Sequence, residues 1–215
     1  MPYGLDMTSL AKRERYAIAQ TLRNLGPDAP TLCEGWTSFD LLVHLISREN
    51  RPDAAIGILI PAFSQYSKKV ADDIKQRGFE TLVQEFEDGP KQFSPFTIPG
   101  IDNLANSFEF LVHHEDLLRA QPNYVARVFG DLDKKLLWKR FTQSGRLFLR
   151  KAKVGIIAKS DQGVFTIKSG NSCVTMEGDV VDLILYSFGR KSAANIKFEG
   201  DEESIRILKE TKFSL

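Results

Sequence analysis

The apolar pattern of this chain changes near residue 150, and that change limits the folds it can adopt. Before this point, apolar residues recur every three or four positions, which is typical of amphipathic helices. After it, short runs rich in β-branched residues alternate with glycine-containing turns, which is typical of strands. We therefore expect an α+β protein, with a helical bundle in residues 1–150 and a small α+β domain in residues 151–215.

Helix-start and helix-stop signals divide the first part into six helices with short connections. Gly26-Pro27 ends the first helix, and Thr37 with Asp40 forms a capping box at the start of the second. The predicted helices cover residues 9–25, 37–49, 61–77, 79–87, 102–120 and 131–150. The sequence therefore predicts a bundle of four long helices with shorter additions.

The second part reads as strand, strand, strand, helix, strand, helix. Asp179 is placed as the N-cap of the first of these helices, and Gly189 ends it. The predicted strands cover residues 154–158, 164–168, 173–176 and 194–198, and the helices cover 180–188 and 202–210. This order predicts a small mixed domain rather than a continuation of the bundle.

Charge and composition exclude several classes of protein. The chain has 29 Lys and Arg against 28 Asp and Glu, so it lacks the basic excess that binding to a nucleic acid backbone needs. Its most apolar stretch, residues 54–63, contains Gly and Pro and is shorter than the roughly 20 residues that cross a bilayer. The first residues carry no basic and apolar leader, so we expect a cytoplasmic protein whose two cysteines, Cys33 and Cys173, are reduced thiols.

All three histidines fall on two predicted helices of the first part. His44 lies on a polar face that also holds Asp40 and Arg48. On the later helix, Glu109 and His113 are four residues apart and therefore neighbours on one face. Each of the two helices thus carries a polar stripe that contains a histidine.

If the two stripes face each other, they supply two imidazoles and one carboxylate, from His44, Glu109 and His113. This set can hold Zn²⁺ or another divalent ion with coordination positions left open, which favours catalysis or ligand capture. Asp40 and Asp116 would then accept hydrogen bonds from the second nitrogens of the imidazoles. The spacing alone also allows interpretations without a metal. Glu-x-x-x-His arises by accident on helices, and Asp40 can be explained fully by its capping role.

Several segments resemble the mycothiol-dependent maleylpyruvate isomerase family, and in particular an actinobacterial branch of it. They are GPDAPTLCEGWT at 26–37, Asp40-Leu41 with His44, RENRPD at 48–53 and EFLVHHED at 109–116. The resemblance covers essentially the whole chain. It implies a DinB-like metal-binding bundle followed by a sterol-carrier-like α+β domain, in which LYSFGR at 185–190 is similar to the family's helix ending in Gly-Arg.

The resemblance also implies a metal and a thiol cofactor. It places His44, Glu109 and His113 as the ligands of a divalent metal, usually zinc, that lowers the pKa of the thiol of mycothiol and presents it as a thiolate. In the isomerase reaction this thiol adds to a cis double bond, permits rotation and leaves. A basic residue must neutralise the substrate carboxylates, and Arg190 is the catalytic candidate, with Arg48 and Arg51 as cofactor-binding alternatives.

Three functions follow from these observations. The first is a thiol-dependent transferase or isomerase acting on a small substrate, as a monomer or homodimer. The second is a metal-stabilised module that binds a small apolar ligand without catalysis, and the third is a hydrolase in which water takes the open metal position. The remaining notable side chains are interpreted structurally: Trp36 as a packing aromatic, Cys33 as a buried inert thiol and Arg190, in its alternative role, as charge compensation at the end of a helix.

Overall fold

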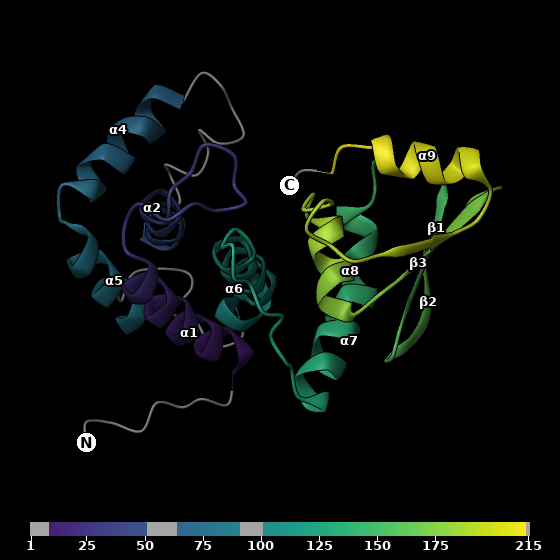
Figure 1. The fold of residues 1–215 in the computed structure, drawn as a ribbon, viewed down its shortest axis with the longest axis horizontal. Coiled ribbons are helices and arrows are strands. Elements are labelled where there is room, and N and C mark those ends of the chain that lie inside the picture. Colours follow the sequence, from purple (N-terminus) through teal and green to yellow (C-terminus); the bar gives the residue numbers. More distant parts are fainter. Residues whose placement is uncertain (1–8, 51–63, 91–100, 214–215) are drawn as a thin grey trace. The chain divides into compact units, whose positions relative to one another are not determined.

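The computed structural model describes residues 9–50, 64–90 and 101–213, with only the backbone described for residue 64 and residues 101–107. These residues form eight helices and four strands, which confirms the expected mixture of helix and sheet (Figure 1). They make two compact units that divide between Val125 and Ala126. Within the described residues, the apolar stretches of the helices are too short for any of them to cross a bilayer.

The described part of the first unit is helical. Helix α1 packs along α5 and α6, and α2 packs along α4 and α5 (Figure 1). The helices are α1 (Leu10–Leu25), α2 (Ser38–Asn50), α4 (Ser64–Lys75), α5 (Phe79–Asp88) and α6 (Ile101–Arg119). Their bounds follow the predicted ones closely, except that residues 61–63, expected at the start of α4, lie outside the described residues.

Apolar side chains from these helices meet in one core. Leu22, Leu41 and Phe110 are fully buried in it, as the three-to-four-residue spacing predicts. Burying one such side chain stabilises the fold by roughly 1.5–3 kcal/mol. The helical unit therefore owes its stability mainly to this shared apolar interior.

A buried ion pair crosses the same core. Arg15 of α1 donates to both carboxylate oxygens of Glu49 and, over 3.0 Å, to the carbonyl oxygen of Phe86. Its guanidinium also lies over the rings of Phe86 and Phe110, 5.0 and 4.8 Å from their centroids. Tyr16, the next residue of α1, is 39% exposed.

The loop between α1 and α2 is held in place by its backbone. Pro30 and Thr37 form a β-bridge, and the amide of Leu32 donates to the carbonyl oxygen of Asp116 on α6 over 3.0 Å. The amide of Trp36 then donates to the carbonyl oxygen of Cys33, which closes a tight turn. Gly35 has a φ of 77° in that turn, a conformation that favours glycine.

The described part of the second unit contains helices and a four-stranded sheet. The strand order is β2-β1-β3-β4, with β1 and β3 parallel and the two outer pairs antiparallel. Asp179 caps α8 as expected, since its side chain accepts from the amide of Val181. The elements are α7 (Asp131–Phe148), β1 (Gly155–Ser160), β2 (Gly163–Lys168), β3 (Cys173–Glu177), α8 (Val180–Ser187), β4 (Lys197–Glu199) and α9 (Glu202–Glu210).

The boundary between the two units lies before α7, and not after it as expected. From the sequence, this helix is expected in the bundle, with the boundary at residue 150. In the structure α7 packs against α8 and β2, with Phe141 fully buried, and it belongs to the second unit. The change of apolar period marks where strands begin, and this is not where the packing changes.

Candidate metal centre

Helices α2 and α6 bring together the three side chains that the sequence selects as metal ligands. The Nε2 atom of His44 lies 3.2 Å from Oε1 of Glu109, and Nε2 of His113 lies 3.3 Å from the same oxygen. One donor atom from each residue lies within 4.8 Å of the other two. Side chains 65 positions apart in the sequence therefore converge on one small volume.

The capping box at the start of α2 helps to define where His44 lies. Oδ2 of Asp40 accepts from the backbone amide and the hydroxyl of Thr37, each over 2.9 Å, and Oδ1 accepts from Nζ of Lys75 over 2.6 Å. Of the two roles that the sequence leaves open for Asp40, these contacts correspond to the cap. His44 follows one helical turn later, with its ring directed at Glu109.

Asp116 orients the imidazole of His113. Nδ1 of His113 lies 3.0 Å from Oδ2 of Asp116, whose side chain is fully buried. This hydrogen bond occupies Nδ1 and leaves Nε2 directed toward Glu109. The arrangement is the carboxylate–histidine contact that commonly fixes the ring of a metal-ligating histidine.

Burial and hydrogen bonds set the charges of these groups. Burial lowers the pKa of His44, which favours the neutral imidazole. Burial alone would raise the pKa of Glu109, but hydrogen bonds from His113 and His44 hold it well below its ordinary value. Burial likewise opposes the charged form of His113, yet its hydrogen bonds to Asp116, Cys33 and Glu109 raise its pKa well above 6.5.

The donor set and its spacing fit a divalent cation. Two imidazole nitrogens and a carboxylate oxygen are a common zinc-binding set, with bonds of about 2.0–2.1 Å. In a tetrahedral site, bonds of that length put neighbouring donor atoms about 3.3 Å apart. The two separations from Glu109, 3.2 and 3.3 Å, match this value.

Two further side chains border these residues. Nε of Arg48 lies 3.5 Å from Oε1 of Glu109, so this arginine adds positive charge beside the carboxylate. The ring of Trp36 packs on the ring of His44 with a centroid separation of 5.1 Å. Arg51, the other arginine selected near this helix, lies outside the described residues.

His114 and Arg190 form hydrogen bonds with residues that do not belong to this cluster. His114 lies toward α1, where Nδ1 is 2.9 Å from Oε2 of Glu14 and Nε2 is 3.0 Å from the hydroxyl of Thr21. In the second unit, the guanidinium of Arg190 donates to the carbonyl oxygen of Phe188, just after α8, over 2.8 Å. This contact corresponds to the helix-end role that the sequence also leaves open for Arg190.

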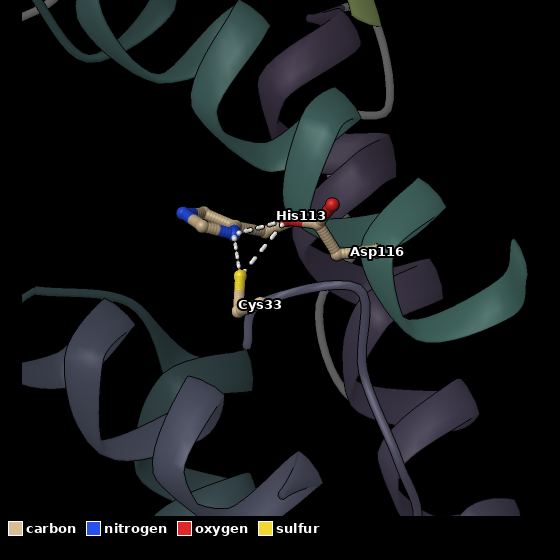
Figure 2. A group of neighbouring side chains, drawn as sticks. All are labelled: Cys33, His113 and Asp116. Atoms are coloured by element: carbon tan, nitrogen blue, oxygen red, sulfur yellow. Dashed lines mark hydrogen bonds and ion pairs between the residues drawn. The ribbon is translucent and has the colours of Figure 1, made fainter. Parts of the chain in front are cut away.

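Sequence reasoning missed the position of Cys33. Its thiol donates to Oδ2 of Asp116 over 3.2 Å and lies 4.0 Å from Nδ1 of His113. Figure 2 shows the thiol pointing toward both side chains. From the sequence, Cys33 is expected to be a buried inert thiol, since all three histidines are distant from it in the chain. The contact arises because the loop before α2 is hydrogen-bonded to α6, and such a long-range contact leaves no pattern in a single sequence.

Comparison with solved structures finds proteins with a similar fold. The crystal structure of the mycothiol-dependent maleylpyruvate isomerase is similar with a TM-score of 0.58 and 16% sequence identity, over 88% of this chain and 90% of that chain. A mutant of that isomerase matches over the same shares with a TM-score of 0.49. No protein-family model and no curated protein matches the sequence. The similarity concerns the fold, and it relates this chain distantly to the isomerase's fold family.

Proposed function

We propose that this protein is a divalent-metal enzyme that uses a small thiol, mycothiol, as cofactor in an isomerase or transferase reaction on a small substrate. The observation that carries the proposal is the convergence of His44, Glu109 and His113, whose donor atoms lie within 4.8 Å of one another, with the two separations from Glu109 close to the value in a tetrahedral zinc site. The fold similarity to an isomerase that depends on mycothiol supports the choice of cofactor. Zinc is the preferred ion because the set contains two imidazoles and one carboxylate.

The metal, when bound, would lower the pKa of a coordinating thiol and so supply a thiolate at neutral pH. The charge states and the orientation of the three side chains suit metal binding. His44 is neutral and can offer Nε2 as a ligand, and Glu109 is ionised. Asp116 holds the ring of His113 so that Nε2 remains available on the side of Glu109.

Arginines would bind the anionic groups of the cofactor and the substrate. Arg48 stands beside Glu109 and is our candidate for holding the thiol cofactor, with Arg51 as a second. Arg190 remains our candidate for binding a substrate carboxylate. We further propose that the helical unit is a DinB-like bundle, that the second unit is sterol-carrier-like and that the enzyme acts in the cytoplasm.

Thermal unfolding in the presence of mycothiol tests this proposal. Zinc-loaded protein should be stabilised by mycothiol and not by an analogue in which a hydroxyl replaces the thiol, because only the thiol binds a zinc ion well. The Glu109→Gln variant should lose the effect. Equal stabilisation by both compounds, or an equal shift in the variant, would contradict thiol binding at the metal.

Turnover measurements separate the proposed enzyme from the other two functions. We expect isomerisation of a cis-unsaturated diacid such as maleylpyruvate, or transfer of the thiol to an electrophile, only when mycothiol and metal are both present. Hydrolysis of ester or amide substrates without any thiol would favour the hydrolase. Tight metal binding with neither activity would favour the non-catalytic module.

A further inference from the structure

A second group of metal-ligating side chains lies on the other side of His113. Cys33, Asp116 and Nδ1 of His113 place one donor atom each within 4.8 Å of the other two (Figure 2). The thiol lies 3.2 Å from Oδ2 of Asp116, and Nδ1 of His113 lies 3.0 Å from the same oxygen. These three residues are called the Cys33 cluster below.

The Cys33 cluster has a different chemical character from the first set. It contains a sulfur ligand, which prefers soft cations such as Cd²⁺ and also binds Zn²⁺. The first set has only nitrogen and oxygen donors. The two sets should therefore differ in which ion they prefer.

The spacing in the cluster suits a cation after small movements of the side chains. Zinc bonds of about 2.3 Å to sulfur and about 2.0–2.1 Å to nitrogen or oxygen place donor atoms roughly 3.3–3.6 Å apart in a tetrahedral site. The observed separations are 3.0, 3.2 and 4.0 Å, on both sides of that range. Shifts of about half an ångström would bring all three donors into range.

The backbone around Cys33 is fixed before any ion binds. The amide of Cys33 donates to the hydroxyl oxygen of Thr31, and that hydroxyl donates to the carbonyl oxygen of Trp36 over 3.0 Å. The amide of the preceding residue, Leu32, is bonded to the backbone of Asp116 itself. The sulfur is thus held next to α6 by main-chain contacts, so an ion would not have to order the loop.

The two sets share one imidazole but use different nitrogens of it. In the first set His113 offers Nε2, and in the Cys33 cluster it offers Nδ1. A cation in the cluster would replace two protons, which leave to solvent: the thiol proton of Cys33 and the proton between Nδ1 and Asp116. It would therefore also remove the hydrogen bond that orients His113 for the first set.

We propose that Cys33, Asp116 and Nδ1 of His113 form a second cation site, selective for thiophilic divalent ions, that competes with the first set for His113. It differs from the site of the proposed function in its ligands and in its preferred ion. Occupation by a soft ion would therefore weaken metal binding at His44 and Glu109. The Cys33 cluster needs neither of those residues to bind its own ion.

Titration of the metal-free full-length protein with Cd²⁺ tests the proposal, with the ultraviolet charge-transfer absorption of a cadmium–thiolate bond as readout. A saturable band is expected in the wild-type protein and in Cys173→Ser, which removes the other thiol. Cys33→Ser should lose the band, whereas His44→Ala, which breaks only the first set, should keep it. A band of equal size in Cys33→Ser, or none in the wild-type protein, would overturn the proposal.

Alkylation of the unmodified protein gives a second readout that needs no variant. Bound Cd²⁺ should protect Cys33 from iodoacetamide, as measured by mass spectrometry of its peptide, while Cys173 in the same sample reacts at an unchanged rate. Equal reactivity of Cys33 with and without Cd²⁺ would contradict the site. Loss of the band in His44→Ala would show that the thiolate-bound ion also needs a ligand of the first set, which refutes a separate Cys33 site and leaves the proposed function standing.

Discussion

At the scale of single residues, two aspartates near the histidines have different roles. Asp116 contacts His113, whereas Asp40 is bound by Thr37 and Lys75. We expect Asp116→Asn to weaken zinc binding by about 10- to 100-fold, as is common when the hydrogen-bond partner of a ligand is changed.

Asp40→Asn is the matched control for this prediction. It should leave the affinity for zinc unchanged, because the amide oxygen can still accept from Thr37, and it should lower the free energy of unfolding by less than about 1 kcal/mol through loss of the ion pair with Lys75. A competition titration with a chelator measures the affinity, and denaturant unfolding measures the stability. Equal losses of affinity in the two variants would refute the distinction between their roles.

The charge of His113 links metal binding to pH. In the metal-free protein the pKa of His113 is raised well above 6.5, so at neutral pH the imidazole carries a proton that binding through Nε2 must displace. The apparent affinity for zinc should therefore rise with pH, by up to about tenfold per pH unit, until the pH passes the folded-state pKa of His113.

The metal-free protein should show the opposite trend in stability. A group whose pKa is raised by folding stabilises the fold fully below its unfolded-state pKa, about 6.5 for histidine, and loses this contribution as pH rises through the folded-state value. Zinc-binding titrations, and denaturant unfolding of the metal-free protein, from about pH 6 to pH 8 measure how the affinity and the free energy of unfolding change with pH. Zinc affinity that does not change over this range would be inconsistent with a protonated His113.

At the scale of helices, the ion pair between Arg15 and Glu49 joins α1 to α2 inside the core. Removing one partner by Arg15→Met or Glu49→Gln leaves an uncompensated polar group or charge, so each change should lower the free energy of unfolding by about 3–5 kcal/mol. The double variant Arg15→Met/Glu49→Gln should be more stable than the sum of the single losses predicts. Strict additivity in denaturant unfolding would show that the pair is not coupled.

The start of α8 depends on a single side chain. Asp179 accepts from the amide of Val181 over 3.0 Å and also pairs with Lys134 of α7. Asp179→Ala should lower the free energy of unfolding by about 1 kcal/mol, and Asp179→Ser, which retains a capping oxygen, should recover part of that loss. Equal losses in the two variants would mean that the cap is not the source of the stabilisation.

The elements themselves were largely predictable because they depend on local patterns. The spacing of apolar residues and the capping residues predict α1, α2 and α9 to within a residue or so, since periodicity and cap chemistry act over a few positions. The pair of polar stripes with His44 and His113 was visible for the same reason. The contact of Cys33 with Asp116 was not, because it depends on how a loop docks on a distant helix.

At the scale of the whole molecule, the two compact units divide the chain differently from the sequence pattern. The sequence marks residue 150, where strands begin, but α7 packs against α8 and β2. The element against which a helix packs depends on the shape and apolar area of both surfaces. Those properties belong to the folded surface, and a single sequence does not display them.

All three proposed metal ligands belong to the first unit, residues 1–125. A chain that ends at Val125 should therefore bind zinc with about the affinity of the full-length protein. Isothermal titration of the two proteins makes the comparison. A truncated protein that is folded by circular dichroism but binds no zinc would show that the metal site depends on the second unit.

The most direct test of the account is the metal content of the purified protein and four variants. Elemental analysis should find about one divalent ion per chain in the wild-type protein and in His114→Gln, whose histidine lies on the same helix but contacts Glu14. The His44→Ala, Glu109→Gln and His113→Ala variants should each lose that ion at the same chelator concentration. Equal metal content in all five proteins would contradict the proposal that these three side chains hold a metal.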